Sequence, residues 1–351
     1  MSHNVLITGG SGYLGGSLLA RWSQANLPAY NKLYALVRTP KQAEAVKQHY
    51  SAEPLTFNAY DEAEVRDAVV GNNITVVYHL ISARFHTSQV FFIKALAEVK
   101  KNTGRDVHFL HTTGAKIFSS HAGAPTDKPL LDSDPNLYEI QKAQKAPFHL
   151  MQEAVDTNNI VIEEAEKHGV RCYLFAPCIV YGEGEGFDNK ISIQTVAIVR
   201  AAEGTKRVYR VDDNRPTWPV CHILDNTNLY LELMRRILAG ENPSYGKKGY
   251  YLASPGSVAW DDIYAAVAKA LTKRGVVLDD TVITANEQDL KAIGDALECP
   301  PAVVPVQLGG YCTFTPDHAS TELGWKPQYK PEHILEYAET EVDLILRHKK
   351  W

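Results

Sequence analysis

The fold is decided near the N-terminus by residues 5–15, which read Val5-Leu6-Ile7-Thr8-Gly9-Gly10-Ser11-Gly12-Tyr13-Leu14-Gly15. A short apolar run, a glycine-rich turn and an apolar helix follow one another here, which is the pattern of a strand, a tight turn and a helix. Gly9, Gly12 and Gly15 have the spacing G-x-x-G-x-x-G. The first glycine permits the turn, the second lets a pyrophosphate approach the backbone, and the third lets the helix pack closely on the sheet.

The helix that begins near Tyr13 adds a second attraction for an anion, because its free N–H groups and its dipole face the turn. A flexible glycine-rich loop is the alternative, but the flanking strand and helix favour a phosphate-binding turn. The pattern therefore predicts that this turn binds a nicotinamide dinucleotide. The predicted contact residues are Gly9, Ser11, Gly12, Tyr13, Leu14 and Gly15.

Downstream of the turn, apolar runs alternate with helical stretches. We expect strands at 33–37, 55–57, 75–80, 107–111 and 172–176, with helices such as 89–100 and 160–168 between them. Continuous apolar runs suit strands that are covered on both faces, and the helices have the length that a right-handed crossover needs. The alternation predicts an α/β fold with a doubly wound parallel Rossmann sheet.

The chain changes character after residue 181. A Gly-Glu-Gly-Glu-Gly run, an apolar helix at 191–202 and a polar loop precede a late strand at 249–253, and βα alternation stops after about residue 255. We therefore predict a dinucleotide-binding domain over 1–181, to which 213–254 returns. Residues 182–212 and 255–351 are predicted to form a smaller, mixed substrate-capping domain.

The composition excludes several classes of partner. The 351 residues carry a net charge of −5, and strongly basic faces are what nucleic acids and anionic membranes select. No apolar run reaches the roughly 20 residues that span a bilayer, and the N-terminus shows no export signal. The five cysteines are scattered and the thirteen histidines form no metal-ligand spacing, so we expect a cytoplasmic protein with reduced thiols and no metal site.

The end of the second strand indicates which dinucleotide is bound. Arg38 follows that strand directly, Lys41 is close by, and no Asp or Glu occurs between residues 33 and 43. A carboxylate at this place would hold the ribose 2′-hydroxyl of NAD, whereas an arginine accommodates the 2′-phosphate of NADP. The sequence thus favours NADP(H), with NAD(H) as the alternative.

Three further segments follow the glycine turn along the chain. They are Val77-Tyr78-His79-Leu80, Ala176-Pro177-Cys178-Ile179-Val180-Tyr181-Gly182 and Ala319-Ser320-Thr321-Glu322-Leu323-Gly324-Trp325-Lys326-Pro327. Together with the glycine turn, Arg38 and the stretch 218–230, they make the chain resemble the extended short-chain dehydrogenase/reductases over nearly its whole length. The nearest group is the NAD-dependent epimerase/dehydratases.

The resemblance implies further cofactor contacts. Leu80, Ile81 and Ser82 would line the cofactor, and Pro177, Ile179 and Val180 would lie along the nicotinamide. Asn58 stands where many relatives have an Asp near the adenine, and its amide could still bind that base.

The family's chemistry needs a Tyr-x-x-x-Lys pair, in which the tyrosine exchanges a proton with the substrate oxygen and the lysine lowers its pKa. Tyr138 and Lys142 have this spacing. However, counting back from Pro177 in the family's usual spacing places the pair at Leu150 and Ala154, which cannot do the chemistry. Either an insertion around 146–149 separates an authentic Tyr138/Lys142 pair from the long helix, or the pair is a coincidence on a surface helix. Pro147 would break a continuous helix in both cases.

The family's active Ser or Thr aligns with Gly114, one residue beyond Thr113. Thr113 could serve after a small shift, and Lys116 is a less favoured replacement acid or ribose ligand. Tyr138, Lys142 and Thr113 are therefore the predicted catalytic residues.

The leading hypothesis is an NADP(H)-dependent oxidoreductase that acts on a carbonyl or alcohol of a small organic molecule. One alternative is an epimerase or dehydratase that keeps its cofactor without net redox change. Another is a non-catalytic protein that senses NADP(H). The expected partner is a small-molecule substrate, and a homodimer is expected only by analogy with such folds.

Overall fold

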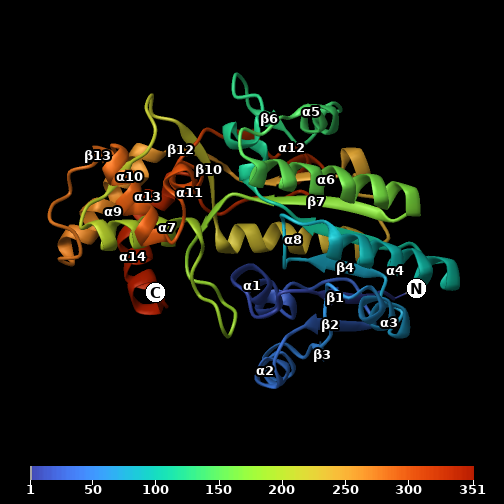
Figure 1. The fold of residues 1–351 in the computed structure, drawn as a ribbon. Helices are drawn as coiled ribbons and strands as arrows, with labels where there is room; N and C mark the ends of the chain where they lie inside the picture. The colour runs from blue at the N-terminus through green and yellow to red at the C-terminus, as the bar shows by residue number, and fades with distance from the viewer. Residues whose placement is uncertain (1) are drawn as a thin grey trace.

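The computed structural model describes residues 2–351, and its centre is a seven-stranded sheet in the order β11-β7-β5-β4-β1-β2-β3 (Figure 1). All six pairings between neighbouring strands are parallel. The strands are β1 (Asn4–Ile7), β2 (Lys32–Leu36), β3 (Glu53–Leu55), β4 (Val76–His79), β5 (His108–Thr112), β7 (Arg171–Pro177) and β11 (Tyr250–Ala253). This confirms the doubly wound α/β sheet.

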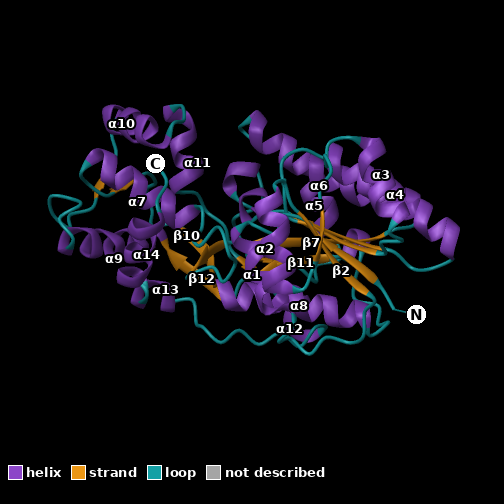
Figure 2. Ribbon diagram, turned by 90° about the horizontal axis from the view of Figure 1, so that it is seen from below, coloured by secondary structure: helices purple, strands orange, loops and turns teal. Residues whose placement is uncertain are grey.

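Helices cover both faces of this sheet (Figure 2). Successive side chains of a strand point to opposite faces, so Leu6 joins one apolar core while Val5 and Ile7 join the other. The first core is covered by α3 (Glu62–Gly71), α4 (Thr87–Thr103) and α6 (His149–His168). The second is covered by α1 (Tyr13–Trp22), α2 (Pro40–Tyr50) and α8 (Ile223–Leu238).

Two local expectations can be compared directly with the structure. The third strand was expected at 55–57 but lies at 53–55, because Leu36 pairs with Leu55 and the chain leaves the sheet after that residue. The break expected at Pro147 is confirmed, since α5 (Leu137–Ala143) and α6 are separate helices on either side of it.

The second part of the molecule contains a three-stranded sheet of β8 (Ile179–Tyr181), β10 (Thr217–His222) and β12 (Gly256–Ala259). Helices surround it on the left of Figure 1. They are α7 (Gln194–Thr205), α9 (Trp260–Lys273), α10 (Glu287–Leu297), α11 (Val304–Leu308), α13 (His333–Glu336) and α14 (Ala338–His348). A two-stranded pair, β9 (Tyr209–Arg210) and β13 (Ile283–Thr284), lies at its edge.

The segment that follows α11 returns to the large sheet. β14 (Phe314–Thr315) pairs with β6 (Leu130–Leu131), and α12 (Asp317–Thr321) packs on β11. The Trp325 indole then donates a hydrogen bond of 3.0 Å to the Asp225 carbonyl oxygen on α8. The division into two domains stays a prediction, and 314–329 is a stretch assigned to the smaller domain that contacts the larger one.

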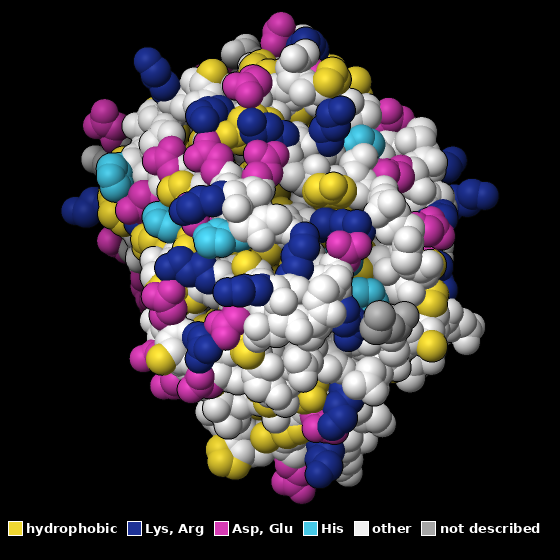
Figure 3. Space-filling model, turned by 90° about the vertical axis from the view of Figure 1, so that its right-hand side faces the viewer, with side chains coloured by type: hydrophobic (Ala, Val, Ile, Leu, Met, Phe, Trp, Pro, Cys, Tyr) yellow, Lys and Arg dark blue, Asp and Glu magenta, His cyan; other side chains and the backbone are white. Residues whose placement is uncertain are grey.

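Figure 3 shows the face of the molecule that lies on the right in Figure 1. Positively and negatively charged side chains are interspersed over this face. Within residues 2–351, no helix is long and apolar enough to cross a bilayer.

Candidate functional site

A cavity of about 540 Å³ opens at the carboxyl ends of β1, β4, β5 and β7. This edge of a parallel sheet, outside the strand ends, is where α/β proteins place their ligands. The walls come from the glycine turn, from the segments 80–84 and 112–117, from the start of α6, and from residues that follow β7. Ser192, Ile193 and Gln194 at the start of α7 complete them from the second part of the molecule.

The glycine turn has the geometry that its spacing predicted. Gly9 has a φ of +68°, a left-handed conformation that side chains rarely adopt, and its carbonyl oxygen accepts a 2.9 Å hydrogen bond from the Gly12 N–H. A Cβ on Gly15 would overlap the Gly9 carbonyl oxygen, so the close packing of α1 on the strand requires glycine there. The backbone is thus exposed to the cavity as a cradle that fits a pyrophosphate.

Gln42 of α2 is a neighbour of the turn that the sequence analysis missed. Its side-chain amide donates a 3.1 Å hydrogen bond to the Ser11 hydroxyl and accepts one of 3.0 Å from the Arg38 N–H. The Arg38 side chain is exposed beside this link, at the end of β2 where it was expected. Nothing in the local pattern marks Gln42, because its role depends on α2 lying against the turn.

Most of the predicted cofactor contacts line the cavity, and four, namely Ser11, Arg38, Asn58 and Ile179, do not. Leu80, Ile81, Ser82, Pro177 and Val180 all contribute to the wall, as does Cys178. Ile179 instead points into the apolar core and is only 1% exposed, because neighbouring residues of β8 face opposite sides. This corrects the expectation for Ile179.

Asn58 also lies outside the cavity wall. Its side-chain oxygen accepts a 3.0 Å hydrogen bond from the Tyr60 N–H, so it closes a local turn after β3. The side chain is exposed at the sheet edge, and the expected contact with adenine stays a prediction.

Residues 182–193, which we call the strap, run beside α1 (Figure 1) and contact the phosphate turn. Gly186 lies directly on Gly16, since a Cβ added to Gly186 would stand 2.8 Å from the Gly16 Cα. The Asn189 N–H donates a 3.3 Å hydrogen bond to the Ser11 carbonyl oxygen. The two glycines are what allow the strap to approach α1 this closely.

Side-chain contacts hold the strap along its length. Glu185 forms an ion pair with Arg21 of α1, with one contact of 2.9 Å, and the Phe187 N–H donates a 2.8 Å hydrogen bond to the Tyr50 hydroxyl of α2. Phe187 therefore packs on α2, whereas Trp218 is in the cavity wall. The strap joins the second part of the molecule to the two helices that flank the phosphate turn.

The structure does not bring Tyr138 and Lys142 to the cavity. The Tyr138 hydroxyl donates a 2.6 Å hydrogen bond to Glu163 of α6, and the Lys142 ammonium lies 2.7 Å from the same carboxylate oxygen. Glu163 is about 20 Å along the helix axis from Leu150, where α6 meets the cavity. Burial and the Glu163 carboxylate raise the pKa of Tyr138, the opposite of what proton transfer at neutral pH needs.

This geometry corrects the expectation that Tyr138 and Lys142 stand at the reacting carbonyl. The two are neighbours on one face of α5, as the spacing required, but that face packs on the distal half of α6. The cavity wall contains Leu150, Met151 and Ala154 instead. Apolar side chains thus occupy the places to which the family's spacing points.

Thr113 does lie at the cavity, directly after β5. Its N–H donates a 2.8 Å hydrogen bond to the Phe175 carbonyl oxygen, and its buried hydroxyl has no hydrogen-bond partner within residues 2–351. Gly114 follows in extended conformation, and a Cβ there would meet nothing within 4 Å. Thr113 therefore lines the cavity, while its hydroxyl oxygen is itself buried.

Lys116, in the short helix 115–118, lies in the same wall. Its ammonium donates a 3.1 Å hydrogen bond to the side-chain oxygen of Gln307 on α11. Burial lowers the pKa of Lys116 to about 8, since a charged amine is poorly solvated there. The sequence analysis treated this lysine as a less favoured acid, because neither its burial nor Gln307 is visible in the local pattern.

The rest of the wall is mostly apolar. Among the residues of 2–351 that line it, Arg84 and Lys116 are the charged ones. The Arg84 guanidinium donates a 2.7 Å hydrogen bond to Glu153 and lies over the Phe85 ring at 4.6 Å, so its charge is already paired.

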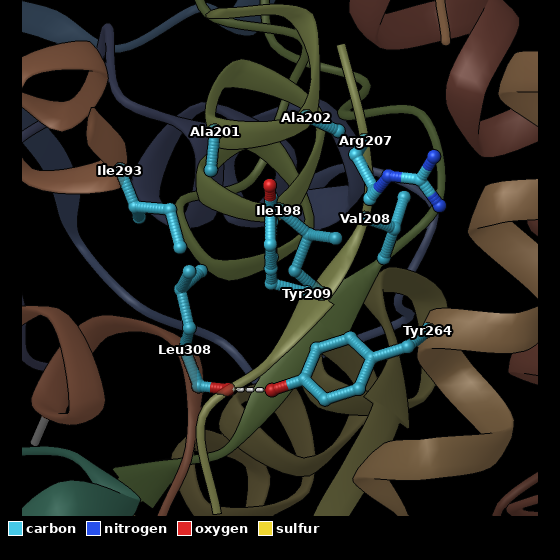
Figure 4. A pocket seen from close by; sticks show the side chains of 9 residues that line it. All are labelled: Ile198, Ala201, Ala202, Arg207, Val208, Tyr209, Tyr264, Ile293 and Leu308. Carbon is cyan, nitrogen blue, oxygen red and sulfur yellow. Dashed lines mark hydrogen bonds between the residues drawn. The ribbon is translucent and has the colours of Figure 1, made fainter. Parts of the chain in front are cut away.

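A second, smaller cavity lies within the second part of the molecule (Figure 4). Its volume is about 10 Å³, close to the minimum for one water molecule. Ile198, Tyr264 and Leu308 are among its walls, and the Tyr264 hydroxyl donates a hydrogen bond to the Leu308 carbonyl oxygen. It has no room for a substrate, so the large cavity is the candidate site.

Solved structures share this architecture. UDP-glucose 4-epimerase from Bifidobacterium longum, in complex with NAD⁺ and UDP, superimposes with a TM-score of 0.64 at 14% identity, over 98% of each chain. dTDP-glucose 4,6-dehydratase from Bacillus anthracis, in complex with NAD, gives 0.65 at 12% identity, over 100% of this chain and 98% of that one. A monomeric L-threonine 3-dehydrogenase from a metagenome gives 0.59 at 15% identity, over 98% and 100%. At these identities the likeness shows the fold.

No curated protein matches this chain in sequence. The sequence model of one family, the NAD dependent epimerase/dehydratase family, matches residues 5–245. These residues include the glycine turn, the segments that form most of the cavity wall, and the stretch 218–230 that was compared with that family above. The chain therefore belongs to the NAD-dependent epimerase/dehydratase family.

Proposed function

We propose that the chain is an NADP(H)-dependent oxidoreductase that interconverts a carbonyl and an alcohol on a small organic molecule. The observation that carries this proposal is a single cavity whose wall includes the glycine turn together with Thr113 and Lys116. A bound nicotinamide dinucleotide supplies or accepts the hydride of such a reaction.

The chain's own residues fit such a cofactor. The turn from Gly9 to Gly15 would hold the pyrophosphate through backbone N–H groups. Arg38, with no carboxylate beside it, would pair with a 2′-phosphate, and Gln42 would hold the turn and the end of β2 together. Leu80, Ile81, Ser82, Pro177 and Val180 would enclose the nicotinamide half. The apolar wall would exclude water from the reacting centre.

The cavity favours a substrate without a nucleoside diphosphate. A diphosphate is usually held by several arginines or lysines, whereas the wall offers Arg84, which Glu153 already pairs, and Lys116. Ile117, Met151 and Trp218 are suited to an aliphatic or aromatic body. We therefore propose small, predominantly apolar aldehydes, ketones or alcohols as the substrate class.

One observation favours a second candidate, an epimerase or dehydratase that retains its cofactor. The strap lies over α1 beside the phosphate turn and is anchored at several points, which would slow the exchange of a bound dinucleotide. The absorbance spectrum of the purified protein separates the two candidates. Stoichiometric consumption of added NADPH supports the oxidoreductase, and turnover with tightly retained cofactor and no net consumption supports the second candidate.

The proposal is tested by titrating the protein with NADPH and NADH and following cofactor fluorescence. Gly12→Asp should abolish binding, since a carboxylate would face the phosphates, whereas Gly71→Asp on α3 should not, because a side chain there meets nothing within 4 Å. NADPH oxidation is then followed with a panel of apolar aldehydes and ketones, and UDP-glucose serves as the comparison. Binding of neither cofactor, or turnover of UDP-glucose in place of the panel, would refute the assignment.

A further inference from the structure

The cavity contains few groups that could exchange a proton with a substrate. The Tyr13 hydroxyl is buried and donates a 2.7 Å hydrogen bond to the Gly182 carbonyl oxygen. The Cys178 thiol donates to the Ala253 carbonyl oxygen at 3.2 Å, and burial raises its pKa well above the usual range. The Arg84 guanidinium is already paired with Glu153. The titratable group of the wall that remains available is Lys116.

Lys116 is also held in a way that leaves protons free. An ammonium has three N–H donors, and the hydrogen bond to Gln307 uses one of them. Gln307 comes from α11, which is 191 residues away along the chain, so the second part of the molecule positions this amine. Because Gln307 is uncharged, it orients the ammonium without stabilising its charge as a carboxylate would.

We propose that Lys116 is the catalytic acid and base of this site, with Gln307 as a positioning residue. This inference rests on the proposed function. In the direction of reduction, the carbonyl carbon gains a hydride from the dihydronicotinamide and the C=O π pair moves to oxygen. That oxygen takes a proton from the Lys116 ammonium, and the resulting neutral amine recovers a proton from water. In the direction of oxidation the amine accepts the hydroxyl proton.

The charged surroundings of Lys116 are consistent with this role. The short helix 115–118 packs against α6 and against the turn 120–122, which carries His121. Burial lowers the pKa of His121, so this histidine is neutral above pH 7 and does not compete for the charge. Glu153 on α6 is paired with Arg84, and Asp212 receives a hydrogen bond from the Gly310 N–H beside His121. Desolvation therefore sets the protonation of Lys116.

The first test compares Lys116→Met with the wild type and with Lys101→Met, a substitution at an exposed lysine on α4. NADPH affinity should stay within about threefold in both variants, while kcat with the best carbonyl substrate should fall by about 10²–10⁴-fold in Lys116→Met alone. If Lys116→Met keeps kcat within threefold of the wild type, the inference fails and the proposed function stands. If the wild type binds NADPH but reduces no carbonyl compound, both fail.

The second test addresses Gln307 through the pH profile. In the wild type, kcat for reduction should fall tenfold per pH unit above about pH 8, where Lys116 loses its proton. Gln307→Glu places a carboxylate on the ammonium and should move this alkaline limb up by about one pH unit or more. Gln307→Leu should lower kcat without moving the limb upward. An alkaline limb that is the same in all three proteins would refute the positioning role.

A third measurement needs no turnover. Trace acetylation at a series of pH values, read out by peptide mass spectrometry on the cofactor-free chain, gives the reactivity of each lysine. Lys116 should become reactive at a pH well below that of Lys101. If both lysines follow the same pH dependence, Lys116 does not have the environment that the inference requires.

Discussion

Replacing Lys116 by Met should stabilise the protein at neutral pH. Burial lowers the pKa of Lys116 from 10.5 to about 8, so the folded chain holds this proton less tightly than the unfolded chain does. The folded state is therefore penalised whenever the amine is charged. A methionine fills a similar volume along the same wall without any charge to desolvate. If the lysine is there for chemistry, its removal should raise stability while it removes activity.

The magnitude follows from the size of the shift. Each pKa unit corresponds to about 1.4 kcal/mol, so the lowering from 10.5 to about 8 sets an upper limit of about 3 kcal/mol at pH 7. The variant also leaves the Gln307 oxygen without its donor, which costs about 1 kcal/mol. We expect a net gain of about 1–2 kcal/mol in the free energy of unfolding at pH 7.

The same shift fixes the sign of the pH dependence. Between pH 8 and pH 10.5 the unfolded chain binds the proton that the folded chain has released, so wild-type stability rises with pH through this contribution. The advantage of Lys116→Met should therefore shrink by about 2 kcal/mol at most between pH 7 and pH 9.5.

Urea unfolding at pH 7.0 and pH 9.5 measures both quantities, and the two proteins should have equal m-values. Lys101→Met is the control and should differ from the wild type by less than about 0.5 kcal/mol at both pH values. A Lys116→Met variant that is less stable than the wild type at both pH values would refute the reasoning. So would a stability difference that does not change with pH.

Three further outcomes are expected. Gly186→Val should push the strap off α1, because even a Cβ there would stand 2.8 Å from the Gly16 Cα. Stopped-flow fluorescence should then show NADPH dissociating about tenfold faster. An unchanged dissociation rate would contradict the idea that the strap retains the cofactor. Arg38→Asp should shift the ratio of NADPH to NADH affinity by at least tenfold toward NADH, measured by fluorescence titration, and no change in the ratio would place the 2′-phosphate elsewhere. Tyr138→Phe should keep kcat within about twofold, because its hydroxyl bonds Glu163 outside the cavity, and loss of activity would restore it to the mechanism.

Local sequence patterns were sufficient to predict the glycine turn, the buried strands and the helix break of this molecule. The glycine spacing specifies a turn that requires a positive φ at Gly9 and close packing at Gly15, and both are backbone constraints that act within a few residues. The apolar runs specify buried strands, and Pro147 specifies a helix break, for equally local reasons. Even the ends of the strands shift by only a residue or two.

The candidate site could be predicted only in part, because its polar groups meet through packing. Tyr138 and Lys142 have a perfect local spacing, yet α5 packs on the far half of α6 and carries them away from the cavity. Sequence spacing records which residues share a helical face, and it does not record what that face covers.

The sequence by itself determined a dinucleotide-binding turn, the strands of a doubly wound sheet and the absence of the family's Tyr–Lys pair at Leu150 and Ala154. Only the tertiary structure decided that Lys116 lies half-buried in the cavity wall and is held by Gln307. The physical reason is that the protonation and orientation of an amine depend on the groups around it, and those groups come from elements far apart along the chain.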